Sequence, residues 1–313
     1  MGTCTNFTVQ MVARINKTVL VFEKEIVSME EGKQRGSAWS IKLAFFLYKI
    51  FGYRFLYLLL YPITFFYFLV ANNAKDALRI YYSRLGIPFT NKIYYEHLRV
   101  FAICLTDRFI SKMNPEDYEF IYENIEIPKK VLEYGSILVY SHFGGWAASS
   151  NGSHVSNKIN VVMREVMLSG ITQIENKLKP KSEINIIDLD QGTIAVSVQV
   201  ANALLNEEVV AMMADRAANQ KAKQEVLFLN EKANFNRNPF QIAYKMNKPI
   251  VAYFIIWVGM QRYKVEYIHI DMDRNISEKD AIEKALTVYV EKFEEIVKKH
   301  PEQWFNLFNF WEK

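Results

Sequence analysis

The chain has 313 residues, of which 50% are hydrophobic and 23% are charged, and its formal net charge is +4. This composition is typical of a globular protein and excludes an intrinsically disordered one. Two cysteines, Cys4 and Cys104, are too few for a disulfide framework or a cysteine-based zinc finger, and they suit a reducing compartment. Aromatic residues make up 14% of the chain, which favours contact with an apolar partner such as lipid.

Residues 1–36 are polar and mixed in charge, and we expect them to form an N-terminal extension. Residues 1–60 hold eight basic and four acidic side chains, whereas the rest of the chain holds 30 of each. The positive excess therefore lies beside the most apolar part of the sequence, where anionic headgroups would attract it. The balanced remainder lacks the basic stripe that is typical of nucleic-acid binding, so no nucleic-acid partner is expected.

Residues 37–73 form an apolar segment that predicts contact with a membrane. The stretch FLYLLLYPITFFYFLVA at 55–71 has no charged residue, but it is a little short for a helix that crosses a bilayer. Upstream, Lys42, Lys49 and Arg54 fall on one helical face and apolar residues on the other, as in helices that lie in the membrane interface. We expect a membrane-binding helical hairpin here; a pair of buried core helices and a true membrane span are the alternatives.

Residues 74–313 have the pattern of one α/β domain. Apolar residues at helical spacing predict helices over 74–85 and 92–112. Beyond residue 119, short apolar runs alternate with helical patterns. Strands are predicted at 136–140, 159–163, 184–187, 209–213, 225–229, 250–257 and 263–270, and helices at 193–205 and 278–299. This alternation predicts a mixed, largely parallel sheet flanked by helices.

The segment SILVYSHFGGWAASSNG at 136–152 carries the strongest indication of chemistry. An apolar strand ends at Tyr140, and His142 follows in a turn with Gly144 and Gly145. Active sites of α/β sheets lie beyond the carboxyl ends of the strands, and a histidine there is suited to general base catalysis. Two glycines allow the backbone to come close to a ligand. The alternative is a structural histidine that is hydrogen-bonded beneath the turn.

This strand, followed by Ser-His-Phe-Gly, a small residue and Trp, resembles the signature of the bacterial lipid A late acyltransferases of the lysophospholipid acyltransferase superfamily. Gly36, Ser37 and Trp39, with the apolar segment after them, are similar to relatives from aryl-polyene lipid clusters. Further similarities follow in the family's order at VVMRE (161–165), MADRA (213–217), FLNEKANFNRNPFQIAYKMNKPIV (228–251) and HPEQWF (300–305). The resemblance extends over residues 36–313.

The resemblance implies a membrane-associated enzyme that moves a fatty acyl group from an acyl carrier protein or coenzyme A thioester to a hydroxyl or amine of a lipid-like acceptor. His142 would be the general base, and backbone N–H groups of the glycines would stabilise the oxyanion. The candidate oxyanion- and substrate-binding residues are Gly144, Gly145, Arg164, Asp215 and Arg237. The protein would lie on the cytoplasmic face of a bacterial inner membrane, with membrane lipid as its partner.

Two of these roles have alternatives. Arg164 would hold an anionic group of the donor or acceptor, and otherwise it forms a salt bridge with a nearby acid. An amine acceptor would make the protein an N-acyltransferase that produces an acylated amino acid.

One position departs from the family's pattern. The family pairs its histidine with an acidic residue, and this chain has Ala147 at that position. In serine proteases, loss of the residue that orients the histidine costs about 10⁴ in rate. Three explanations stay open: the chain is an inactivated variant, it binds lipid without catalysis, or another carboxylate orients His142. The candidates for that carboxylate are Glu165, Asp188, Asp190 and Asp215.

Other enzyme classes lack their signatures in this sequence. It contains no Gly-x-Ser-x-Gly elbow, no Walker loop and no dinucleotide-binding glycine fingerprint. The five histidines include no pair at i and i+4 spacing. We therefore expect neither a metal ion nor a cofactor.

Overall fold

The computed structural model describes residues 38–145, 158–164, 184–217 and 219–311. The expected polar extension at 1–36 and the position of Ala147 lie outside these residues.

A seven-stranded sheet has the order β1-β9-β8-β2-β5-β3-β4. Its strands are β1 (Glu119–Glu123), β2 (Ser136–Tyr140), β3 (Ile159–Met163), β4 (Ile184–Asp188), β5 (Val209–Met213), β8 (Ile250–Gly259) and β9 (Arg262–Ile270). Among the described strand pairs of this sheet, only β8–β9 is antiparallel. The predicted mixed, largely parallel sheet is therefore confirmed.

The predicted strand at 225–229 does not join this sheet. It forms β6 (Lys223–Phe228), which pairs antiparallel with β7 (Glu231–Asn236) in a separate hairpin. Leu229 and Asn230 connect the two strands with φ values of 51° and 64°. Positive φ at both central residues is the signature of a type I′ turn, which matches the twist of a tight hairpin.

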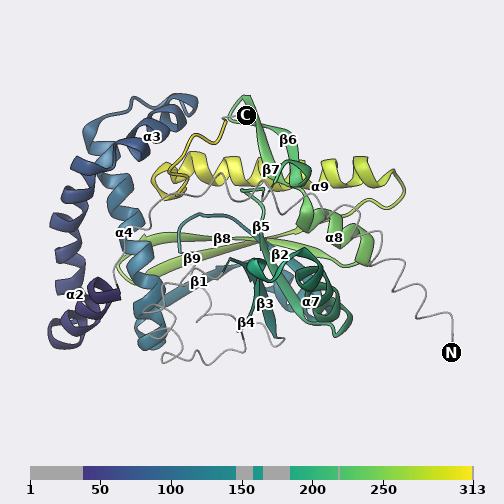
Figure 1. The fold of residues 1–313 in the computed structure, drawn as a ribbon, viewed down its shortest axis with the longest axis horizontal. Helices are drawn as coiled ribbons and strands as arrows, with labels where there is room; N and C mark the ends of the chain where they lie inside the picture. Colours follow the sequence, from purple (N-terminus) through teal and green to yellow (C-terminus); the bar gives the residue numbers. More distant parts are fainter. Residues whose placement is uncertain (1–37, 146–157, 165–183, 218, 312–313) are drawn as a thin grey trace.

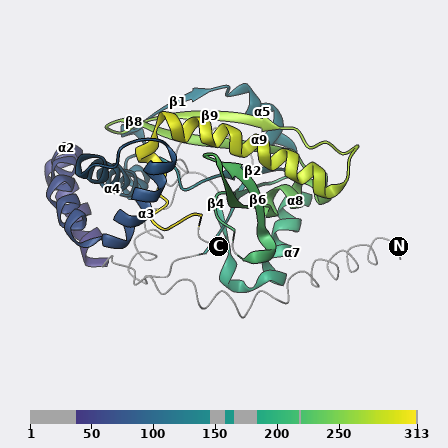
Figure 2. The ribbon, with the colours of Figure 1, turned by 90° about the horizontal axis from the view of Figure 1, so that it is seen from above.

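Helices flank the sheet (Figures 1 and 2). They are α2 (Ala38–Val70), α3 (Asn72–Arg84), α4 (Asn91–Met113), α5 (Glu126–Val131), α7 (Thr193–Leu205), α8 (Asn238–Met246) and α9 (Glu278–Lys299). Short 3₁₀ helices are η2 (Pro115–Asp117), η3 (Leu132–Tyr134), η5 (Leu189–Gln191), η6 (Gln220–Ala222) and η7 (Pro301–Gln303). The predicted helices at 193–205 and 278–299 have these same bounds.

The sheet separates two buried apolar clusters because successive strand residues point to opposite faces. From β2, Ile137 and Val139 pack in the cluster that contains α7, α8 and α9. Leu138 and Tyr140 pack on the other face, in the cluster that contains residues of α2 and α4. Both faces of β2 are thus covered, as its continuous apolar run requires.

The expected apolar segment is present as α2, which has 33 residues and a break at Gly52 (φ 73°, ψ −179°). The break divides α2 into two helical stretches, and Pro62 lies inside the second. Residues Phe46–Val70 are long and apolar enough to cross a membrane, and the structure describes one such helix among the residues it covers.

One face of α2 contacts α4, and the other is apolar and exposed. Tyr53 and Leu56 are buried on the protein side. We define the apolar surface of α2 as its large side chains that are more than half exposed: Phe46, Ile50, Phe51, Leu58, Phe65, Phe66 and Leu69. Large apolar patches of this kind are typical of binding sites for lipid or protein.

Candidate active site

The candidate site lies where β2 and β5 end. These strands are parallel neighbours, and the last residue of β2, Tyr140, pairs with the last residue of β5, Met213. His142 and Asp215 each follow two positions later in the sequence. The register of the two strands therefore brings the histidine and the carboxylate together at the carboxyl edge of the sheet.

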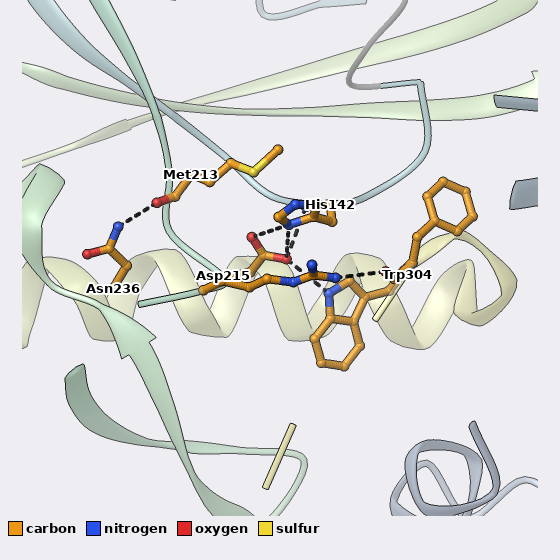
Figure 3. Close-up of polar contacts among 7 residues, drawn as sticks. His142, Met213, Asp215, Asn236 and Trp304 are labelled. Atoms are coloured by element: carbon orange, nitrogen blue, oxygen red, sulfur yellow. Dashed lines mark hydrogen bonds and ion pairs between the residues drawn. The ribbon is translucent and has the colours of Figure 1, made fainter. Parts of the chain in front are cut away.

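His142 and Asp215 form a hydrogen-bonded pair (Figure 3). The imidazole Nδ1 lies 3.1 Å from both carboxylate oxygens of Asp215. The backbone N–H of His142 also donates to Oδ2, at 3.0 Å. The Asp215 side chain is fully buried, whereas 23% of the His142 side chain is exposed. The buried member thus orients the member that solvent or a substrate can reach.

The charge state of Asp215 defines the tautomer of His142. Burial alone raises the pKa of this carboxyl, but the neighbouring His142 and Arg216 outweigh it and the pKa is lowered. An ionised carboxylate can only accept hydrogen bonds, so Nδ1 of His142 carries a proton. The lone pair of the neutral ring is then on Nε2, which is the atom a general base uses.

A segment after α9 holds this pair from a second side. The indole Nε1–H of Trp304 donates to Oδ2 of Asp215 at 3.3 Å (Figure 3). Phe143 and Trp304 form an antiparallel bridge, and the N–H of Phe305 donates to the His142 carbonyl at 2.8 Å. The family similarity at HPEQWF (300–305) indicated this segment, but the contact of Trp304 with Asp215 was not predicted.

Arg216 contributes positive charge beside Asp215. Its Nη2 donates to the Phe305 carbonyl at 3.0 Å, and its guanidinium carbon lies 4.7 Å from the centre of the Phe308 ring. These contacts anchor the guanidinium next to the carboxylate whose pKa it lowers. The segment after α9 therefore positions both the donor and the cation that stabilise ionised Asp215.

The glycines of the turn are required for its shape. Gly144 has a φ of 53°, and a Cβ there would lie 1.9 Å from the Ile255 carbonyl oxygen. A Cβ on Gly145 would lie 2.3 Å from Cε1 of Tyr263. The turn thus passes so close to β8 and β9 that it admits no side chain at either position.

The geometry does not support the expected role of these glycines as oxyanion donors. The N–H of Gly144 donates to the Gln303 carbonyl at 2.8 Å, and that of Gly145 donates to the Ile255 carbonyl at 2.9 Å. Each N–H has one proton, and here that proton is used to hold the turn against the protein. In this structure both N–H groups are thus engaged within the protein.

Arg164 lies at the end of the neighbouring strand β3. Its Nε donates to Oδ1 of Asp190 at 3.0 Å, and its side chain is 33% exposed. Met163 pairs with Asp188, so the register of β3 and β4 brings Arg164 and Asp190 together. Such a salt bridge is the alternative role that the sequence indicated for Arg164. The contact keeps a cation at the carboxyl edge of the sheet.

Arg237 lies between β7 and α8. Its backbone N–H donates to the Ala222 carbonyl at 2.8 Å, and its Nε is buried without a hydrogen-bond partner among the described residues. No described contact joins it to His142 or Asp215. Within the described part of the chain, no group of three or more His, Cys, Asp or Glu side chains could hold a metal ion.

The model of one protein family, described as "Bacterial lipid A biosynthesis acyltransferase", matches residues 92–313. The chain belongs to this family. The match confirms the resemblance found in the sequence, and it includes His142, Asp215 and Trp304. Membership in the lipid A biosynthesis acyltransferase family supports an enzyme that transfers acyl groups in lipid biosynthesis.

No curated protein matches the chain. Among solved structures, the chain is similar to the crystal structure of the 1-acyl-sn-glycerophosphate (LPA) acyltransferase PlsC from Thermotoga maritima, at 15% sequence identity and a TM-score of 0.35. The similarity covers 77% of this chain and 97% of that chain.

For a lipid A biosynthesis acyltransferase, the notable feature is the carboxylate at Asp215. Ala147 stands where the family's pattern has an acid, and it lies outside the described residues. Of the carboxylates considered as substitutes, Asp215 contacts His142, whereas Asp190 contacts Arg164. The explanation in which another carboxylate orients His142 therefore has a structural basis.

Proposed function

We propose that this protein transfers a fatty acyl group from an acyl thioester to a hydroxyl or amine of a lipid or lipid-like acceptor, with His142 as the general base. The observation that carries this proposal is the contact between the partly exposed imidazole and the buried carboxylate of Asp215. Family membership supports acyl transfer in general. The chemistry of a histidine oriented by a carboxylate supports the assignment of the base.

The reaction balances with these two side chains. Nε2 of His142 takes the proton from the acceptor hydroxyl or amine while its oxygen or nitrogen attacks the thioester carbonyl. The tetrahedral intermediate then collapses, the carbon–sulfur bond breaks, and the imidazolium returns the proton to the leaving thiolate. The products are the acylated acceptor and a free thiol. Asp215 holds Nδ1–H and stabilises the imidazolium in between.

The donor is an acyl carrier protein or coenzyme A thioester, and Arg164 is the candidate site for an anionic group of donor or acceptor. Both donors carry phosphate, which a guanidinium binds strongly through paired hydrogen bonds. Arg164 is partly exposed and bonds one oxygen of Asp190. A substrate phosphate would compete with this carboxylate. Arg237 remains a weaker candidate because no described contact places it beside His142.

The apolar surface of α2 supports association with a membrane. Lys49 and Arg54 are exposed on the same helix and would approach anionic headgroups. A helix with exposed apolar and basic groups is suited to the membrane interface. We place the protein on the cytoplasmic face of a bacterial inner membrane, because acyl carrier protein and coenzyme A thioesters are donors of the cell interior.

The test is a thioester-consumption assay with the full chain in mixed phospholipid and detergent micelles. Acyl carrier protein and coenzyme A thioesters are offered in parallel, thiol release is measured, and mass spectrometry identifies an ester or amide product. His142→Ala should abolish turnover, whereas His269→Ala, an exposed histidine beside Asp271, should not.

The alternative is a lipid-binding protein of the same fold without catalysis, which Ala147 first suggested. Lipid binding that survives His142→Ala, without thiol release from any donor, would favour that alternative and contradict the enzyme. An amide product on an amino acid would instead identify an N-acyltransferase that uses the same base.

A further inference from the structure

A second buried carboxylate, Asp107 on α4, has no part in the proposed chemistry. Its side chain is fully buried and accepts hydrogen bonds from three tyrosine hydroxyls. Tyr53 and Tyr118 donate to Oδ1 at 2.5 and 2.8 Å, and Tyr263 donates to Oδ2 at 2.5 Å. We refer to these four residues as the Asp107 cluster.

The cluster joins three separate parts of the fold. Tyr53 belongs to α2, immediately after the break at Gly52. Tyr118 follows η2 and precedes β1, and Tyr263 lies in β9. Figures 1 and 2 show α4 between α2 and the sheet. One carboxylate therefore connects the helix that carries the exposed apolar surface to the sheet that carries the candidate active site.

The connection continues from Tyr263 to the turn of His142. The ring of Tyr263 lies so close to Gly145 that a Cβ on this glycine would be 2.3 Å from Cε1 and 2.5 Å from Cδ1. The N–H of Gly145 is held by the carbonyl of Ile255 on β8, the strand that pairs with β9. Gly145 is three positions from His142, so a displacement of the Tyr263 ring acts on the backbone that positions the imidazole.

A buried carboxylate transmits such a displacement because the loss of one of its hydrogen bonds costs much free energy. Removal of one partner leaves a buried charged group unsatisfied, and the full desolvation penalty of that group is then lost to stability. Tyr53 and Tyr263 bind different oxygens of one rigid, planar group. If α2 moves Tyr53, the carboxylate turns with it and pulls on the hydroxyl of Tyr263, unless one of the bonds breaks.

We propose that Asp107 is a positioning residue that couples the seating of α2 to the geometry of the His142 turn, through Tyr53 on one side and Tyr263 with Gly145 on the other. Membrane contact at the apolar surface of α2 then aligns the base for catalysis. The kinetic part of this inference rests on the proposed function, whereas the structural part does not.

Tyr53→Phe tests the structural part, and Tyr118→Phe is its matched control. Both variants remove one hydroxyl from the same oxygen of Asp107 and keep the ring. Tyr118 belongs to neither α2 nor the residues that meet Gly145. Hydrogen–deuterium exchange of the full chain in phospholipid micelles reports the amide of Gly145, with amides of α7 as an internal reference for global stability.

Coupling predicts that Tyr53→Phe raises the exchange rate of the Gly145 amide about 10-fold relative to the α7 amides, since the lost bond is worth about one factor of ten. Tyr118→Phe should leave it within about 2-fold. If Tyr53→Phe loosens α2 while Gly145 exchanges as in the wild type, or if both variants act alike, the cluster is only an anchor and the proposal is overturned.

The kinetic readout separates this proposal from the proposed function. Where thiol release is measurable, Tyr53→Phe and Tyr263→Phe should lower kcat by about 10-fold and leave KM within about 2-fold, because misalignment of the base affects the transition state more than substrate binding. A change in KM alone contradicts the proposal. Absence of thiol release in the wild type contradicts the proposed function, and the exchange result still decides the coupling.

Discussion

His142 and Asp215 are 73 positions apart in the chain, yet each lies two positions beyond one member of the register pair Tyr140 and Met213. Parallel strands end at the same edge of a sheet, so equal offsets from a register pair bring two side chains to the same place. The fully buried Asp215 then holds Nδ1 of the partly exposed imidazole. In the proposed function, a carboxylate two positions beyond the end of β5 thus takes the role that the family's pattern gives to the position of Ala147.

Asp215→Asn should lower turnover by about 10³- to 10⁴-fold, because an amide at this site no longer imposes the tautomer with the lone pair on Nε2. Substrate affinity should change little, since Asp215 is buried behind the imidazole. Steady-state thiol release measures both quantities. Asp273→Asn, at a partly exposed carboxylate paired with Lys284, is the control. A variant that retains wild-type turnover would show that Asp215 does not orient the base.

Trp304→Phe should lower kcat by about 10-fold and leave KM unchanged. The substitution removes the N–H that donates to Asp215 and keeps an aromatic ring in the buried apolar core. Trp311→Phe is a matched control: this ring lies 6.2 Å from Trp304, and its Nε1 has no hydrogen-bond partner among the described residues. Equal effects of the two substitutions would mean that packing, and not the donated hydrogen bond, explains the loss.

Gly144→Ala should abolish turnover and destabilise the fold by several kcal/mol, because it adds a clash with the Ile255 carbonyl to the cost of a positive φ. Gly192→Ala measures a backbone cost of positive φ without a clash. Gly192 has a φ of 84° and a ψ of 155°, which residues other than glycine rarely adopt, and nothing lies within 4 Å of an added Cβ, so about 1–3 kcal/mol is expected there. Chemical unfolding compares the two. If the two variants lose the same free energy of unfolding, the turn does not lie against β8.

The Asp107 cluster predicts a dependence of stability on pH. Burial raises the pKa of Asp107 to about 6, although the hydroxyls of Tyr263, Tyr53 and Tyr118 oppose the rise. An unfolded aspartate titrates near pH 3.9. Since the folded protein binds this proton more tightly, the stabilisation is complete below about pH 4 and is lost as the pH rises through about 6. The expected loss is about 3 kcal/mol.

Asp107→Asn measures this loss, because an amide does not titrate. Between pH 4 and pH 7, the unfolding free energy of the wild type should fall by about 3 kcal/mol relative to that of the variant. The lowered pKa of Asp215 acts in the opposite direction, but it is common to both proteins and cancels in the difference. A difference that does not vary with pH would mean that Asp107 titrates in its ordinary range.

The apolar surface of α2 predicts binding to vesicles. Replacing Phe65, Phe66 and Leu69 by serine removes three side chains that are more than half exposed. Burial of one such side chain in lipid is worth about 1.5–3 kcal/mol. The partition coefficient onto anionic vesicles, measured by sedimentation, should therefore fall by at least about 100-fold. Leu227→Ser, at an exposed leucine of the β6–β7 hairpin, is the control. Undiminished sedimentation would place the membrane contact elsewhere.

Much of the site could be predicted from local pattern. The strands at 136–140 and 209–213 have the predicted bounds, because uninterrupted apolar runs between turn residues are typical of strands buried on both faces. The histidine after the first strand and the acid after the second were therefore both identified. β7 was not predicted, since its sequence EKANFN mixes charged and polar residues and only part of it is buried.

The sequence by itself determined the α/β class, the apolar segment that became α2 and the candidate residues for chemistry, because each of these depends on neighbours in the chain. Only the tertiary structure decided which of them meet. Strand order is not written in local periodicity, so the adjacency of β2 and β5, which selects Asp215 as the partner of His142, is a property of the folded sheet. The contact of Trp304 with Asp215 and the contact of Tyr263 with Gly145 likewise depend on packing between distant segments.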